Sequence, residues 1–133
     1  MTSNSRRLRS ATPLMYGYIR SSLERPEYVA ACRETLEQWC ARAGWNLGGV
    51  FTDVGGSLDS VDRIGFRGLL DALGLPNAAG VVLVDGAHLS PRPEIVTSLA
   101  RQIRRTGASI LVMDGELPPE AMKLCQGQRE FSR

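Results

Sequence analysis

The chain alternates short apolar runs with longer stretches in which apolar residues recur three or four positions apart. The apolar runs, which we expect to be strands, cover residues 14–20, 45–52, 79–84 and 108–113. The stretches with helical spacing cover residues 26–43, 64–73 and 93–105. Continuous apolar strands separated by amphipathic helices are typical of βαβ units. The pattern therefore predicts an α/β fold with a doubly wound, mostly parallel sheet of four to five strands and helices on both faces.

The two ends of the chain lack this alternation. Residues 1–12 are polar and without hydrophobic period, so we expect a disordered tail. Residues 13–115 are predicted to form one domain, since a chain of 133 residues can bury a single core. Residues 116–133 are predicted to be a short C-terminal helix or tail, with a helix that starts at Pro118 and Pro119 and covers Glu120 to about Gln128.

Composition narrows the possible classes of function. The net charge is +2 and the three cysteines lack metal-ligand spacing, so we expect reduced thiols and no metal site. Two of them, Cys32 and Cys40, fall on the apolar face of a predicted helix. The longest apolar run, residues 78–84, is too short to span a bilayer, and we expect a cytoplasmic protein without a membrane partner. Neither the glycine-rich P-loop of nucleoside triphosphate-binding proteins nor the GxGxxG motif of dinucleotide-binding proteins is present, so no cofactor is expected.

The segment YGYIRSS places polar residues at the end of an apolar strand. Side chains alternate in a strand, so Tyr18, Arg20 and Ser22 are predicted to share one face. Ligands of open α/β sheets bind beyond the carboxyl ends of the strands. Arginine at such an end would repel the following helix dipole unless an anion is bound nearby. Asp85 and Asp114, which follow later strands, are better explained as caps or turn residues.

Three stretches together resemble the catalytic domain of the serine recombinases, the resolvase and invertase family. YIRSS is similar to the family pattern Y-x-R-x-S. FTDVGGSLDSVDRIGFRGLLDAL is similar to its F-x-D, Gly/Ser loop, D-R-x-G and apolar helix, and AAGVVLVDGAHLSP takes the place of its third strand and following loop. The resemblance rests on the order and spacing of these three stretches more than on any one of them.

The resemblance implies roles for four residues. Ser22 would be the nucleophile that attacks a DNA phosphodiester, Arg20 and Arg63 would clamp the phosphate, and Asp53 would be the acidic residue after the second strand. Clustered guanidiniums neutralise and align a phosphoryl group during transfer, which fits this chemistry. Residues 55–57 would belong to a loop that moves when DNA arrives.

The match breaks after the third strand, where the family carries an acid and two arginines. Residues 86–91 of this chain read GAHLSP, and Arg92 lies one position late between two prolines. His88 is expected to be a surface or turn residue. We therefore expect a degenerate, non-cleaving member that works as a binding or regulatory module, with a protein partner, a homo-oligomer or an anionic ligand. The alternative is an active DNA recombinase that cleaves through Ser22 with help from a partner. Without a further DNA-binding domain, DNA contact would be weak.

Overall fold

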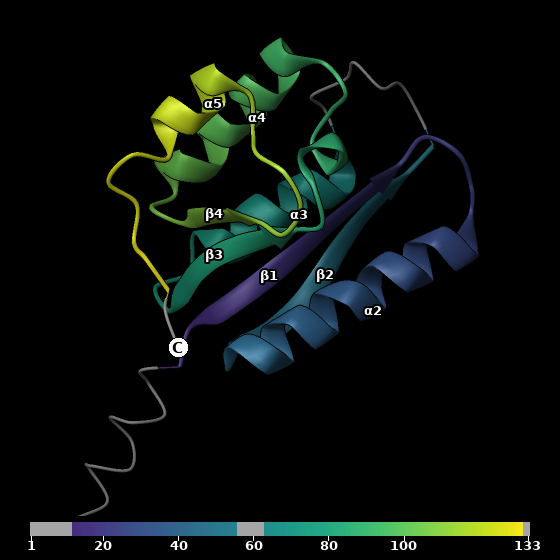
Figure 1. The fold of residues 1–133 in the computed structure, drawn as a ribbon, viewed down its shortest axis with the longest axis horizontal. Coiled ribbons are helices and arrows are strands. Elements are labelled where there is room, and N and C mark those ends of the chain that lie inside the picture. The colour runs from purple at the N-terminus through teal and green to yellow at the C-terminus, as the bar shows by residue number, and fades with distance from the viewer. Residues whose placement is uncertain (1–11, 56–62, 132–133) are drawn as a thin grey trace, which may run out of the picture.

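The structure is a computed structural model that describes residues 12–55 and 63–131. Its elements are, in chain order, β1 (Leu14–Ser21), α2 (Pro26–Ala43), β2 (Asn46–Val54), α3 (Ile64–Leu73), β3 (Ala78–Leu83), η1 (Gly86–His88), α4 (Pro93–Arg105), β4 (Ser109–Val112) and α5 (Pro119–Leu124). The strands and helices predicted from the hydrophobic pattern are all present (Figure 1). Strand β2 extends further than predicted, to Val54, so Asp53 lies within it instead of following it.

Prolines and glycine mark the helix ends in the way the sequence predicts. Helices α2 and α4 each carry a proline in the first turn, where the missing N–H would have no partner within the helix. Helix α2 ends at Gly44, whose φ of +78° is accessible to glycine at little cost. The chain can therefore turn sharply from α2 into β2.

The described strands form one four-stranded parallel sheet in the order β2-β1-β3-β4. The chain moves outward from β1 to β2, then returns to the other side of β1 for β3 and β4, so the strand order reverses between β1 and β3. This is the doubly wound arrangement, and the predicted α/β class is confirmed. Ligands of such sheets bind in the crevice at the reversal point, beyond the carboxyl ends of the strands.

Helices cover both faces of the sheet (Figure 1). On one face α2 packs against β1 and β2 around a cluster that includes Met15, Ile19, Cys32, Leu36 and Cys40. On the other face α3 and α4 bury the larger cluster, whose buried side chains are Tyr18, Phe66, Leu69, Leu73, Val81, Leu83, Leu89, Val96, Leu99, Ala100, Ile103, Ala108, Ile110, Leu117 and Ala121. Tyr18 and Ile19 thus lie on opposite faces, as strand alternation requires.

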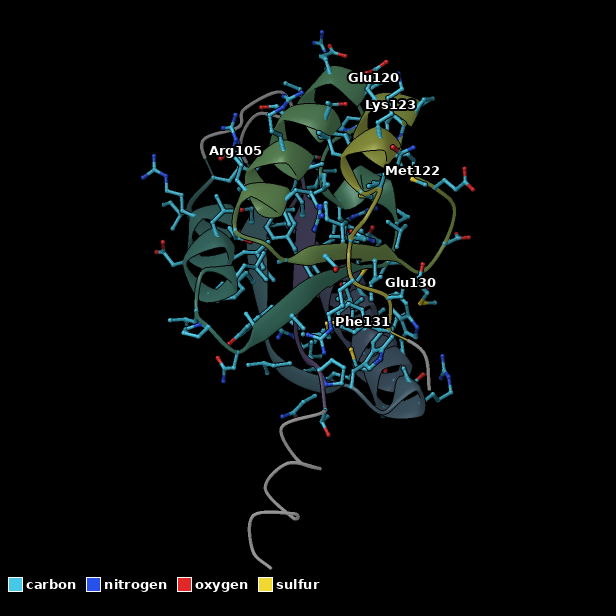
Figure 2. All side chains as sticks on the ribbon, turned by 90° about the vertical axis from the view of Figure 1, so that its left-hand side faces the viewer. Arg105, Glu120, Met122, Lys123, Glu130 and Phe131 are labelled. Atoms are coloured by element: carbon cyan, nitrogen blue, oxygen red, sulfur yellow. The ribbon has the colours of Figure 1, made fainter. Side chains whose placement is uncertain are left out.

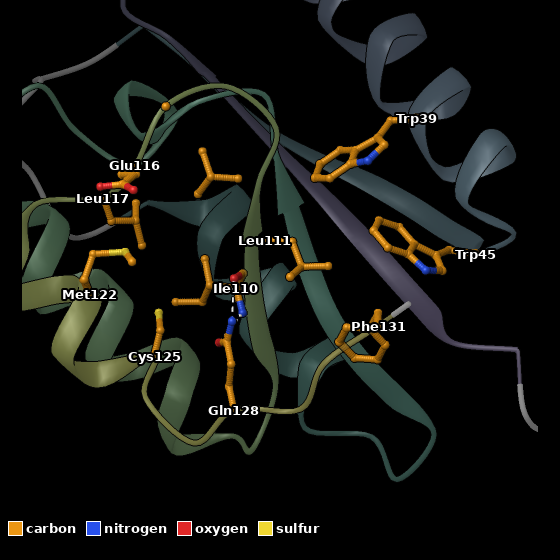
Figure 3. A pocket seen from close by; sticks show the side chains of 12 residues that line it. Trp39, Trp45, Ile110, Leu111, Glu116, Leu117, Met122, Cys125, Gln128 and Phe131 are labelled. Carbon is orange, nitrogen blue, oxygen red and sulfur yellow. Dashed lines mark hydrogen bonds between the residues drawn. The ribbon is translucent and has the colours of Figure 1, made fainter. Parts of the chain in front are cut away.

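The segment after β4 folds back along the edge of the sheet that β4 forms. Helix α5 packs beside α4 and ends at Leu124, earlier than predicted, with Glu120, Met122 and Lys123 on its exposed side (Figure 2). The Gln128 amide then exchanges two hydrogen bonds of 3.0 Å with the main chain of Ile110 (Figure 3). A glutamine side chain therefore takes the place that a further strand would occupy at this point of the edge.

Two predicted features lie outside the described residues. The predicted disordered tail covers residues 1–12, of which the structure describes only Thr12, and the predicted moving loop is described only up to Gly55. The boundary drawn after residue 115 stays a prediction. Within residues 12–55 and 63–131, no helix has the length and apolar character needed to cross a membrane.

Candidate functional site

The candidate site lies where β1 and β3 end, beside the point at which the strand order reverses. Strand β1 delivers Arg20 and Ser21, and the chain bends directly afterwards at Ser22. Strand β3 is followed by Asp85 and the short helix η1, which carries His88. Helix α3 contributes Arg63 at its N-terminal cap position. Residues from distant parts of the sequence therefore meet at one end of the sheet.

Two guanidinium groups are buried together at this end. Arg20 is 7% exposed and Arg63 is 6% exposed. The Nη2 atom of Arg20 is buried without a hydrogen-bond partner among the described residues. Burial, followed by the charge of Arg63, lowers the pKa of Arg20, and Tyr18 and the Asp53 carboxylate oppose this only in part. Placing two cations side by side in a poorly solvated site is costly unless an anion offsets their charge.

Asp53 organises the start of α3 through three accepted hydrogen bonds. Its Oδ1 accepts from the N–H of Gly65 at 2.7 Å, and its Oδ2 accepts from the N–H of Phe66 at 2.9 Å. The Tyr18 hydroxyl donates to the same Oδ2 at 2.6 Å. A carboxylate that binds free N–H groups at a helix N-terminus caps that helix from outside it. Asp53 therefore fixes the start of α3, directly after Arg63.

Tyr18 links this cap to the guanidinium pair. The Arg63 Nη1 donates to the Tyr18 hydroxyl at 3.4 Å, while that hydroxyl donates to Asp53. Burial, and then the bond to Asp53, raises the pKa of Tyr18 well above its usual value, so the hydroxyl stays protonated and keeps donating. The predicted common face of Tyr18 and Arg20 agrees with their electrostatic interaction. The positions of Tyr18 and Arg63 therefore depend on the Asp53 carboxylate that caps α3.

Ser22 lies outside the strand, contrary to the prediction that it shares the face of Tyr18 and Arg20. Strand β1 ends at Ser21, which is buried and donates its hydroxyl to the carbonyl of Leu23 at 2.6 Å. Ser22 follows in a bend and is exposed. Its position therefore depends on the bend after β1 and not on strand alternation.

The segment after β3 differs from what the sequence predicted. His88 is in a turn, as expected, but it is buried and not at the surface. Asp85 accepts a hydrogen bond from the N–H of Ala87 at 2.9 Å, so its expected role as a cap is confirmed. Arg92 forms a salt bridge with Glu94 at 2.8 Å on the exposed start of α4. This segment thus brings a buried imidazole to the site, and the Arg92 guanidinium pairs with Glu94.

Sequence reasoning missed the contacts that connect His88 to α2 and β1. The His88 Nδ1 accepts the main-chain N–H of Arg20 at 3.1 Å, and its Nε2 lies 3.9 Å from the Cys32 Sγ. These residues are 68 and 56 positions away from His88, so no local spacing could have indicated the contacts. Among the described residues, no group of three or more His, Cys, Asp or Glu side chains could hold a metal ion.

Comparisons with solved structures agree with this architecture. The catalytic domain of ISC1926 TnpA, an IS607-like serine recombinase, is 19% identical with a TM-score of 0.68, over 84% of this chain and 74% of that one. The N-terminal catalytic domain of TP901-1 integrase is 16% identical with a TM-score of 0.66, over 75% of this chain and 76% of that one. A serine recombinase from Sulfolobus solfataricus is 22% identical with a TM-score of 0.62, over 84% of this chain and 75% of that one. At sequence identities this low, the structural similarity establishes the fold alone.

The family itself is shown by the sequence. No curated protein matches the chain. The profile of the family described as "Resolvase, N terminal domain" matches residues 15–126, which include Arg20, Ser22, Asp53 and Arg63. That span runs from the first strand through the last helix, and so covers all the elements that build the site. The chain therefore belongs to the resolvase family and carries its N-terminal, catalytic-type domain.

Proposed function

We propose that this resolvase-like domain binds a phosphate-like anion, such as a DNA backbone phosphate, between Arg20 and Arg63 and does not cleave DNA by itself. The observation that carries the proposal is the buried Arg20 guanidinium, whose Nη2 has no partner among the described residues and whose neighbour is a second buried arginine. An oxyanion at this position would accept hydrogen bonds and offset the repulsion between the two cations.

The segment after β3 supports the absence of cleavage. In the family pattern this segment carries an acid and two arginines, and here the corresponding positions are Ala87, His88 and Pro91. Burial lowers the pKa of His88, so its imidazole is neutral at neutral pH. Loss of one preorganised donor costs about a hundred- to a thousand-fold in rate, and loss of a phosphoryl-transfer arginine costs about a thousand-fold or more. Two missing guanidiniums would leave little strand cleavage.

A second candidate function is an active recombinase that is completed by a partner. The observation in its favour is the exposure of Ser22, which leaves its hydroxyl accessible next to the strand that carries Arg20. A partner protein would then have to supply the missing cations. The two candidates differ in one chemical product, a phosphoserine bond between DNA and Ser22.

Anion binding can be tested by titration with sulfate and with a short oligonucleotide at low salt. We expect the NMR signals of Arg20 and Arg63 to move, and the binding to weaken as salt is added. Arg20→Gln should abolish the shift, whereas Arg101→Gln, which alters an exposed arginine of α4, should leave it unchanged. Signals that stay in place at low salt would contradict the proposed ligand site.

Cleavage can be tested separately with supercoiled plasmid and with suicide oligonucleotides. We expect no nicking and no protein–DNA adduct on a denaturing gel or by mass analysis. The matched control is Ser22→Ala, which removes the one hydroxyl that the family pattern makes the nucleophile. An adduct formed by the unmodified chain and absent from Ser22→Ala would establish the second candidate in place of the first.

A further inference from the structure

A single imidazole lies beside β1, beyond the point where the pairing of β1 with β3 ends. The pairing of β1 with β3 ends at Gly17 and Val82, although β1 continues to Ser21. The main chain of Arg20 thus extends beyond its pairing with β3. His88, 2% exposed, supplies an acceptor there, because its Nδ1 receives the Arg20 N–H at 3.1 Å. A buried main-chain donor would otherwise carry a substantial free-energy cost.

The contacts of His88 determine where its proton sits. A nitrogen that accepts an N–H carries no proton, so the neutral ring is protonated on Nε2. That Nε2 lies 3.9 Å from the Cys32 Sγ, which can accept weakly. The Tyr28 ring stacks on the imidazole at a centroid distance of 6.1 Å and an interplanar angle of 14°. Helix α2 therefore holds the ring with Nδ1 directed at β1.

The titratable and charged groups around His88 belong to η1, β1 and α2. Asp85 caps η1 itself, Arg20 belongs to β1, and Cys32 and Tyr28 belong to α2. Burial is the largest influence and lowers the pKa of His88. The Asp85 carboxylate and then the contact with the Arg20 main chain partly oppose it, while the Arg20 charge adds to it. The neutral ring is consequently the stable form at neutral pH.

We propose that neutral His88 is a positioning residue for the anion site, because its Nδ1 holds the main chain of Arg20 where the guanidinium can bind an oxyanion. Protonation of Nδ1 would replace this acceptor by a donor aimed at the Arg20 N–H, and Arg20 would have to move. Binding of the anion should therefore require the unprotonated imidazole. This inference rests on the proposed function, since it assigns a third residue to the site of Arg20 and Arg63.

A direct attraction between a protonated His88 and the anion would have the opposite effect, and the geometry disfavours it. The Arg20 guanidinium lies on the Tyr18 side of the sheet, near Arg63. The His88 ring instead contacts α2, which covers the other face. The imidazole contacts the main chain of Arg20, whereas the proposed anion would contact its guanidinium, so we expect the loss of positioning to outweigh the added charge.

The two effects predict opposite pH dependences. If only the neutral form binds, the apparent affinity falls by up to about tenfold for each pH unit below the pKa of His88. By reciprocity, a bound anion should lower the pKa of His88 further. A histidine that acted as a cation toward the anion would instead strengthen binding as the pH falls.

The test is a sulfate titration across a range of pH, because sulfate keeps both charges throughout. His88 is the only histidine in the chain, so its imidazole NMR signals are unambiguous. We expect the ¹⁵N shifts to show protonation on Nε2, and sulfate affinity to fall with the protonation of His88. In His88→Asn, the amide oxygen can still accept from Arg20 but does not titrate, so affinity should stay near that of the unmodified chain and be independent of pH.

A second variant separates positioning from charge. His88→Leu removes the acceptor, and sulfate affinity should fall about 2- to 10-fold at every pH, as expected for one lost hydrogen bond. If this variant does not fold, the test rests on His88→Asn, whose sulfate affinity should not depend on pH. A sulfate affinity of His88→Asn that changes with pH would overturn the inference.

Two further results would contradict the proposal in distinguishable ways. Sulfate affinity that is constant or rises on acidification, while the Arg20 and Arg63 signals still respond, would overturn the role of His88 alone. Absence of any response of those signals at every pH would overturn the proposed anion site together with it. A neutral imidazole protonated on Nδ1 would overturn the role of His88 without any ligand.

Discussion

Removal of the Asp53 carboxylate should destabilise the domain well beyond what is usual for a polar residue near the surface. In Asp53→Ala, the N–H groups of Gly65 and Phe66 lose their acceptor, and so does the buried hydroxyl of Tyr18. Loss of a helix cap costs about 0.5–2 kcal/mol. A buried donor left without a partner costs about 1–3 kcal/mol. Because these contributions share one site and do not simply add, we expect a loss of about 2–4 kcal/mol.

This loss can be measured by urea unfolding, followed by the fluorescence of Trp39 and Trp45 in the other half of the core. The matched control is Asp71→Ala, which removes an exposed carboxylate from the same helix and should change the free energy of unfolding by less than about 0.5 kcal/mol. Tyr18→Phe should cost less in the Asp53→Ala background than in the unmodified chain, because the hydroxyl has already lost its acceptor. A loss for Asp53→Ala no larger than that of the control would refute the view that this carboxylate anchors α3.

Two further predictions concern pH and the approach of α3 to β2. The folded-state pKa of His88 lies below its ordinary value of 6.5, so the unfolded chain takes up a proton first on acidification. Stability should therefore fall as the pH drops below about 6.5, and His88 should contribute at most about 1.4 kcal/mol per pH unit to this fall. Unfolding titrations of His88→Asn should lack this contribution. If the free energy of unfolding depended on pH equally in both proteins, the predicted role of His88 would be contradicted. In Gly65→Ala, the added Cβ would clash with the main-chain oxygen of Thr52 in β2, and we expect a loss of about 1–3 kcal/mol or more in thermal or urea unfolding. Gly74→Ala, whose Cβ would meet nothing closer than 3.5 Å, is its control, and equal stability of the two variants would contradict the close approach.

Much of the fold could be predicted because its signals are local. Apolar residues at helical spacing and the prolines at the starts of α2 and α4 set the helix positions, and continuous apolar runs set the strands. The predicted bounds of α2, α3 and α4 agree with the structure. Alternation along β1 correctly separated Tyr18 from Ile19. Each of these features depends on residues only a few positions apart.

The candidate site was predicted less completely, because its contacts join residues far apart in the chain. The motifs proposed Arg20, Ser22, Asp53 and Arg63 as site residues, and the tertiary structure buries both arginines at one end of the sheet. The three hydrogen bonds of Asp53 depend on where α3 begins relative to β2, which no spacing in the sequence specifies. The exposed position of Ser22 depends on where β1 ends.

His88 is the clearest case of a residue whose environment depends on the tertiary structure and not on local sequence. By sequence it is a lone polar residue after a strand, for which a surface or turn position is the usual outcome. Its burial depends on tertiary neighbours, because β1 continues beyond its pairing with β3 and contacts the ring there, and Tyr28 and Cys32 of α2 lie against the ring. The sequence by itself determined the elements and their apolar faces, since these repeat at short range. The strand order and the register between strands determined which side chains meet, because they bring together residues whose separation in the chain carries no periodic signal.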